Sequence, residues 1–147
     1  MKTKTFFFLF LLFAASSANA DLGTKIRTVG VWAIFRSEDP MTDKASCTAV
    51  FNEHQMVVGK LYIGVPHGPK TAVLRFDAEP ALPLRLTSNT ETKIDSIFIE
   101  GRDFAKVLTS QRLRFSSLNV FDQLIQGEIP LKDAPAIQTV LRSKACQ

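Results

Sequence analysis

The sequence is poor in the residues that most often carry chemistry. Its 147 residues include two cysteines and two histidines, His54 and His67. No GxSxG elbow or cysteine–histidine pair accompanies either histidine, so we assign neither a catalytic role. A metal site built on both histidines would lack an obvious third ligand. These absences argue against an enzyme and against a bound cofactor or metal.

Long hydrophobic runs are also missing, except for a short one near the first residue. Lys2 and Lys4 precede an apolar run, Phe6–Ala15, and Ala18-Asn19-Ala20 then supplies the small residues that signal peptidase accepts. A run of about 10 apolar residues is too short to cross a bilayer ~30 Å thick. We therefore expect residues 1–20 to be a signal peptide, and we expect no membrane span.

The remaining residues, 21–147, have the length of one domain that can bury its own core. Loss of the two leader lysines lowers the formal net charge from +4 to +2. So small a charge does not predict nucleic-acid binding, which normally shows as clustered lysine and arginine. We expect a single β-rich domain that is periplasmic or secreted.

The two cysteines, Cys47 and Cys146, lack the CxxC spacing of a redox or metal-binding pair. Two cysteines allow only one intramolecular pairing, which an oxidising compartment would favour. We therefore expect a structural disulfide. It would close a loop of about 100 residues, for which the loss of chain entropy gives up to ~4.7 kcal/mol of stabilisation.

Alternation of apolar and polar residues with a period of two dominates the chain and predicts strands. It occurs in Met56–Val65, Thr71–Asp77, Leu82–Leu86, Asp95–Ile99, Arg112–Phe115 and Phe121–Leu131, while Val29–Phe35 is apolar on both faces. Trp32, the single tryptophan, lies in Val29–Phe35, and we expect its side chain to be buried in the core. About eight short strands separated by turns predict a mainly β fold, an antiparallel β-sandwich or barrel-like sheet.

Two segments depart from this rhythm. Asp103–Ser110 and Asp133–Lys144 have apolar residues at helical spacing, and each begins with an aspartate that can cap a helix. We expect one short internal helix and a C-terminal helix. The disulfide would tie the latter to the strand that carries Cys47.

A cluster of acidic residues, Glu38, Asp39 and Asp43, surrounds Pro40. The cluster lacks the alternating acids and the glycine of a calcium-binding loop. Proline presets φ in a turn, and aspartate side chains can hydrogen-bond their own backbone. We interpret the segment as a hairpin turn.

Arginines recur on the polar faces of the predicted strands: Arg75, Arg85, Arg112 and Arg114. If these strands are neighbours, the outward arginines form a basic face that can bind an anionic glycan, lipid headgroups or an acidic protein. The alternative is an ordinary solvated sheet face with glutamates between the arginines.

Several short motifs occur in a suggestive order: the strand with Trp32, the Asp-Pro-Met-Thr-Asp turn at 39–43, Leu-Arg-Phe-Asp at 74–77, and Thr-Val-Leu-Arg at 139–142 before Cys146. This layout resembles exported bacterial proteins of the invasion-associated locus B type and related small periplasmic proteins associated with type VI secretion. The resemblance implies a periplasmic or surface β-sandwich without catalytic residues, sometimes linked to host-cell entry or secretion.

Two functional hypotheses follow. In the first, the chain is an exported, non-enzymatic binding protein of the bacterial envelope that binds a protein or an anionic envelope component. In the second, it is a periplasmic inhibitor or immunity protein that blocks an enzyme active site with a surface loop such as Pro66–Lys70. Neither hypothesis requires a cofactor.

Overall fold

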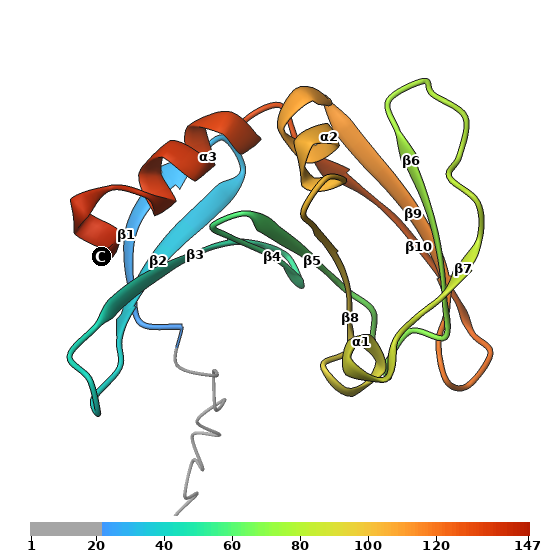
Figure 1. Cartoon of the computed structure of the whole chain (residues 1–147), viewed down its shortest axis with the longest axis horizontal. Helices are drawn as coiled ribbons and strands as arrows, with labels where there is room; N and C mark the ends of the chain where they lie inside the picture. Colours follow the sequence, from blue (N-terminus) through green and yellow to red (C-terminus); the bar gives the residue numbers. More distant parts are fainter. Residues whose placement is uncertain (1–21) are drawn as a thin grey trace, which may run out of the picture.

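A computed structural model describes residues 22–147, and the predicted signal peptide lies outside the described residues. The described chain forms two antiparallel sheets with short helices at their ends (Figure 1). The prediction of a mainly β, antiparallel sandwich-like fold is therefore confirmed. No helix in residues 22–147 is long and apolar enough to cross a membrane.

The first sheet has six strands in the order β1-β2-β3-β4-β5-β8. Its strands are β1 (Thr24–Val29), β2 (Trp32–Glu38), β3 (Ala45–Phe51), β4 (His54–Val57), β5 (Lys60–Gly64) and β8 (Ser96–Glu100). One row of buried residues crosses five of these strands: Ile34, Ala49, Met56, Leu61 and Ile99. This row is part of the contribution of the six-stranded sheet to the hydrophobic core.

Two strand predictions were wrong because each segment contains a turn. A turn at Gly30-Val31 separates β1 from β2, and Val58-Gly59 separates β4 from β5. Gly30 and Gly59 have φ values of 58° and 72°, which glycine adopts without a steric penalty. A valine precedes each glycine and an apolar residue follows within two positions, so the two segments look continuous in the sequence.

The second sheet has four strands in the order β10-β9-β6-β7. Its strands are β6 (Thr71–Phe76), β7 (Arg85–Leu86), β9 (Arg112–Leu118) and β10 (Leu124–Pro130). Alternation places Ala72, Leu74 and Phe76 on the buried face of β6. The residues between them face away from the core.

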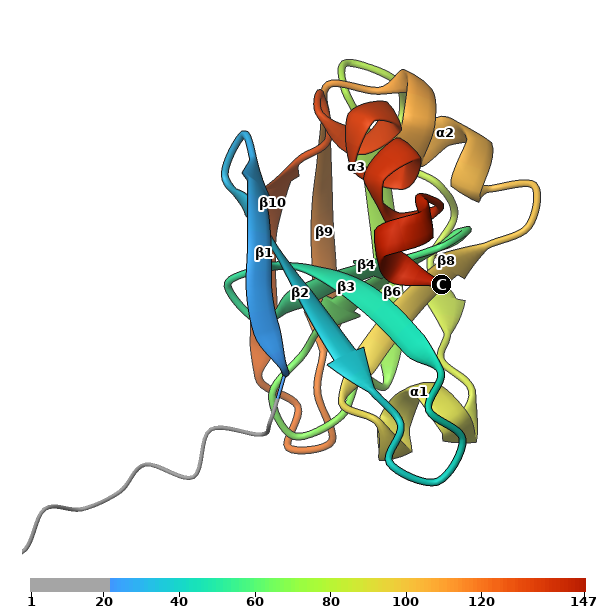
Figure 2. The same cartoon turned by 90° about the vertical axis from the view of Figure 1, so that its left-hand side faces the viewer.

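The helices are α1 (Asn89–Lys93), α2 (Phe104–Thr109) and α3 (Ala134–Leu141), followed by the 3₁₀ turn η1 (Lys144–Cys146). Both views show α2 and α3 together at one end of the sheets and α1 at the other (Figures 1 and 2). The two predicted helices are present, but neither Asp103 nor Asp133 caps its helix through the side chain. Asp133 instead packs against Gly30, which has no Cβ to exclude it.

Two long-range links close the fold. The predicted disulfide joins Cys47 on β3 to Cys146 in η1, 99 residues later, with their Cα atoms 5.1 Å apart. Trp32 is fully buried, as predicted, and its Nε1 donates a hydrogen bond to the carbonyl oxygen of Pro130 at 3.1 Å. The C-terminal part of the chain, from β10 to η1, is thus fastened to β2 and β3.

Candidate binding surface on the four-stranded sheet

The outward face of the four-stranded sheet carries three arginines close together. Arg75 on β6 lies directly opposite Arg114 on β9, and Arg112 points to the same face two residues earlier on β9. We call Arg75, Arg112 and Arg114 the basic row. Like charges directly opposite each other destabilise a sheet, so the fold itself gains nothing from this pairing.

The arginines of the basic row are held mainly by neutral groups. Arg75 Nε donates to the carbonyl oxygen of Glu79 at 2.8 Å, and Arg114 Nη2 donates to that of Asp77 at 2.9 Å. Within the described residues, only Arg112 of the three forms an ion pair, with Glu128 at 3.7 Å. Backbone carbonyl groups therefore orient the charges of Arg75 and Arg114, and no carboxylate among residues 22–147 neutralises them.

A row of exposed leucines crosses the same face nearer the β9–β10 loop. On β7, Leu86 pairs with Thr71 of β6. The Thr71 Oγ1 accepts a hydrogen bond from the backbone N–H of Leu118 on β9. Leu118 in turn pairs with Leu124 on β10. The exposed fractions of Leu86, Leu118 and Leu124 are 77%, 36% and 60%. We call these three residues the leucine row.

The two rows lie side by side on one surface. Leu118 and Arg114 are four residues apart on β9, which corresponds to ~13 Å along a strand. Ser116 lies between them and pairs with Val73. The surface can therefore offer apolar contact and positive charge to the same partner.

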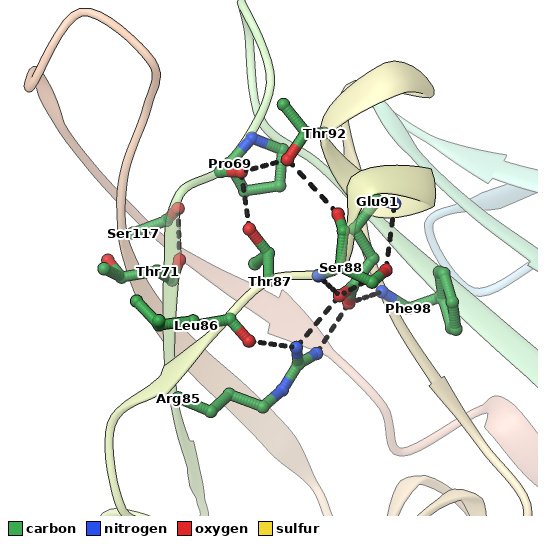
Figure 3. A network of polar contacts seen from close by, with 10 residues as sticks. All are labelled: Pro69, Thr71, Arg85, Leu86, Thr87, Ser88, Glu91, Thr92, Phe98 and Ser117. Carbon is green, nitrogen blue, oxygen red and sulfur yellow. Dashed lines mark hydrogen bonds and ion pairs between the residues drawn. The ribbon is translucent and has the colours of Figure 1, made fainter.

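The structure brings together three of the four predicted arginines and places Arg85 elsewhere. Arg85 lies opposite Ala72, a buried residue, so its side chain turns to the inner face of the sheet. There its Nη1 and Nη2 bind the Glu91 carboxylate at 2.9 and 2.6 Å (Figure 3). Leu86, expected to point inward, points outward for the same reason.

Glu91 is the centre of the polar network in Figure 3. Its side chain is 3% exposed and also accepts hydrogen bonds from the backbone N–H groups of Ser88, at 2.8 Å, and Phe98, at 3.1 Å. Burial alone would raise the pKa of Glu91, but the hydrogen bonds from Arg85, Ser88 and Phe98 outweigh it and lower the pKa to about 2. Glu91 thereby joins β7, α1 and the free edge of β8.

The sequence carries a local signal for this network. Ser88-Asn89-Thr90-Glu91 has the spacing of a capping box, and the structure shows both of its hydrogen bonds at the start of α1. By contrast, no local pattern indicates the leucine row, because its members come from three separate strands.

The loop Pro66–Lys70 is held at Pro69 by two side-chain hydrogen bonds. The Pro69 carbonyl oxygen accepts hydrogen bonds from Thr87 Oγ1 at 2.6 Å and Thr92 Oγ1 at 2.9 Å (Figure 3). Gly68 and Pro69 are buried, whereas His67 is exposed. The His67 ring packs edge-on against Phe121, with the ring centroids 5.3 Å apart.

The other histidine, His54, is buried between the two sheets. Its Nδ1 accepts a hydrogen bond from the Gly64 backbone N–H at 3.2 Å, and its ring packs edge-on against Phe115. Burial lowers the pKa of His54 because the charged imidazolium loses its hydration. Its environment is that of a neutral core residue.

The acidic cluster forms the predicted hairpin turn between β2 and β3. Asp39 Oδ1 accepts a hydrogen bond from the Met41 backbone N–H at 2.8 Å, and Asp39 Oδ2 accepts one from Thr42 Oγ1 at 2.9 Å. The Met41 and Thr42 hydrogen bonds lower the pKa of Asp39. In the part of the chain that the structure describes, no three His, Cys, Asp or Glu side chains gather to hold a metal ion.

Comparison with known proteins gives no match. No family model matches the chain, and neither does any curated protein or solved structure. The resemblance to invasion-associated locus B proteins stays a prediction from the sequence.

Proposed function

We propose that the protein is an exported, non-enzymatic binding protein of the bacterial envelope, which docks an acidic protein through the basic and leucine rows. The disulfide between Cys47 and Cys146 is compatible with an oxidising compartment outside the cytoplasm. A link to host-cell entry or secretion, implied by the sequence resemblance, belongs to the same proposal.

The observation that carries this proposal is the side-by-side placement of the two rows. Burial of an exposed leucine side chain contributes about 1.5–3 kcal/mol before the costs of association, so the leucine row can supply affinity. Uncompensated arginines add steering and orientation toward an acidic surface. A glycan would satisfy the arginines but offers little apolar surface to the leucines, which favours a protein partner.

The test uses the mature chain, which we define as residues 21–147 without the predicted signal peptide. It is immobilised and exposed to an envelope extract of the bacterium that produces it, and retained proteins are identified by mass spectrometry. We expect a partner that is retained at low salt and weakened at high salt, because exposed charges are screened within about 8 Å at physiological ionic strength. The double variant R75E/R114E should release it, and so should L118S/L124S.

The matched control is K25E/R27E on β1, an exposed strand of the other sheet, which changes the net charge by the same amount. This variant should retain the partner. A partner that is insensitive to salt, or that survives R75E/R114E, would refute the proposed role of the basic row.

One observation favours the second candidate, an inhibitor or immunity protein. The rings of His67 and Phe121 are exposed and pack against each other beside Pro69, whose carbonyl oxygen is hydrogen-bonded, and a preordered pair of rings loses little entropy when it enters an active site. In that case H67A/F121A should abolish binding while R75E/R114E leaves it intact. The two variants thus separate the two candidates.

A further inference from the structure

A cleft of about 570 Å³ opens where the two sheets part, between β8 and the strands β6 and β7. This volume lies within the range of small-molecule sites, roughly 300–1,000 Å³. β8 ends one sheet and β7 ends the other, as Figure 1 shows, so each pairs with a strand on one side only. The apolar part of the lining includes Leu74, Phe76, Leu82 and Ile99.

The residues that line the cleft include more acidic than basic side chains. Three of its residues are acidic, Glu91, Glu100 and Asp103, and one is basic, Arg85. Both Nη atoms of Arg85 already bind Glu91, so the Arg85 guanidinium is not available to bind an anion through these two atoms.

The two remaining acids differ in their partners. Glu100 pairs with Lys60 at 2.5 Å. The Asp103 carboxylate accepts no hydrogen bond and forms no ion pair within 4.0 Å among residues 22–147, and it does not cap α2. Its charge nevertheless acts on Arg85, whose pKa is raised mainly by Glu91 and to a smaller extent by Asp103. Lys106, whose Nζ lies 5.8 Å from the Phe76 ring, is paired with Glu79. Among the acids of the cleft in residues 22–147, Asp103 is therefore the one whose carboxylate oxygens remain available to hydrogen-bond a cation, with Arg85 already bound to Glu91.

We propose that this cleft binds a small hydrophobic cation, an amine with an aromatic or aliphatic body. The body rests on Leu74, Phe76 and Ile99, and the ammonium group faces Asp103. The network around Glu91 holds one wall of the cleft in place, so this wall loses little conformational entropy when a ligand binds. This site is separate from the outer face and does not depend on the proposed docking function.

The test is a titration of the ¹⁵N-labelled mature chain, followed by amide chemical shifts, with three matched probes. The probes are 2-phenylethylamine, 3-phenylpropionate and 3-phenyl-1-propanol, which share a phenyl group and differ mainly in charge. We expect the amine to give saturable shifts in β6, β8 and residues 82–88, and to bind more tightly than the alcohol or the acid.

The variant D103N should weaken amine binding by about two- to fivefold, the range for one partly exposed ion pair, and should leave the alcohol unaffected. E128Q removes the same charge from the outer face and should leave amine binding unchanged. Asp103 makes no side-chain hydrogen bond, so D103N should fold normally. Shifts that do not saturate, equal binding of the three probes, or unchanged amine binding by D103N would overturn the proposal.

Discussion

The substitution Glu91→Gln tests the network that joins β7, α1 and β8. Glutamine keeps the shape of the side chain but removes the charge that balances Arg85, and its single carbonyl oxygen cannot replace both carboxylate oxygens as acceptors. The backbone N–H groups of Ser88 and Phe98 then compete for that oxygen. We expect a clear loss of stability at neutral pH.

The expected magnitude follows from the pKa of Glu91. A pKa of about 2, against 4.5 for the free side chain, corresponds to roughly 3–4 kcal/mol at ~1.4 kcal/mol per pH unit. Arg85 is partly exposed, so solvent screens the pair and the loss in Glu91→Gln should be about 2–3 kcal/mol.

The pH dependence has a definite sign. Because the pKa of Glu91 is lowered on folding, the unfolded state binds the proton first as the pH falls. The stabilisation is complete above pH ~4.5 and is lost between pH ~4.5 and ~2. The difference between the natural chain and Glu91→Gln should therefore shrink toward zero across this window.

The assay is urea denaturation at a series of pH values, followed by the fluorescence of Trp32, which is the only tryptophan and is fully buried. Glu100→Gln is the control, because Glu100 makes an exposed ion pair that should contribute less than about 1 kcal/mol. The reasoning fails if Glu91→Gln costs no more than Glu100→Gln, or if its deficit does not change with pH.

Two further predictions concern stability. The double variant C47S/C146S should lose about 2–4 kcal/mol of unfolding free energy, because the disulfide no longer limits the conformational entropy of the unfolded chain between two cysteines 99 residues apart. An unchanged urea midpoint would contradict this prediction. Since burial lowers the pKa of His54, the unfolded state takes up the proton first and stability should fall as the pH drops below ~6.5. His54→Phe should remove that slope between pH 7 and pH 5, whereas the exposed His67→Ala should keep it, and identical slopes in both variants would refute the assignment.

Local patterns in the sequence predicted much of the fold. Period-two alternation located most strands, since one face of each lies in the core, and helical spacing located α2 and α3. The interruptions at Gly30 and Gly59 were missed because a glycine inside an apolar run is compatible with both a strand and a tight turn. The positive φ of each glycine is a property of the folded chain.

The candidate surface was predicted only in part. Arg75, Arg112 and Arg114 share a face as expected, because the alternation within β6 and β9 is clear. Arg85 and Leu86 were assigned to the wrong faces. A two-residue strand has too little pattern to define its orientation, and Glu91, in a different element, determined it.

The sequence by itself determined the strand-rich character of this protein, its single disulfide and its buried tryptophan, because alternation, cysteine count and side-chain hydrophobicity act locally or admit one solution. Tertiary structure decided which strands became neighbours, and hence that three leucines and three arginines share one surface while a cleft opens between two sheet edges. These features depend on contacts between residues far apart in the chain, which only the completed packing of the two sheets defines.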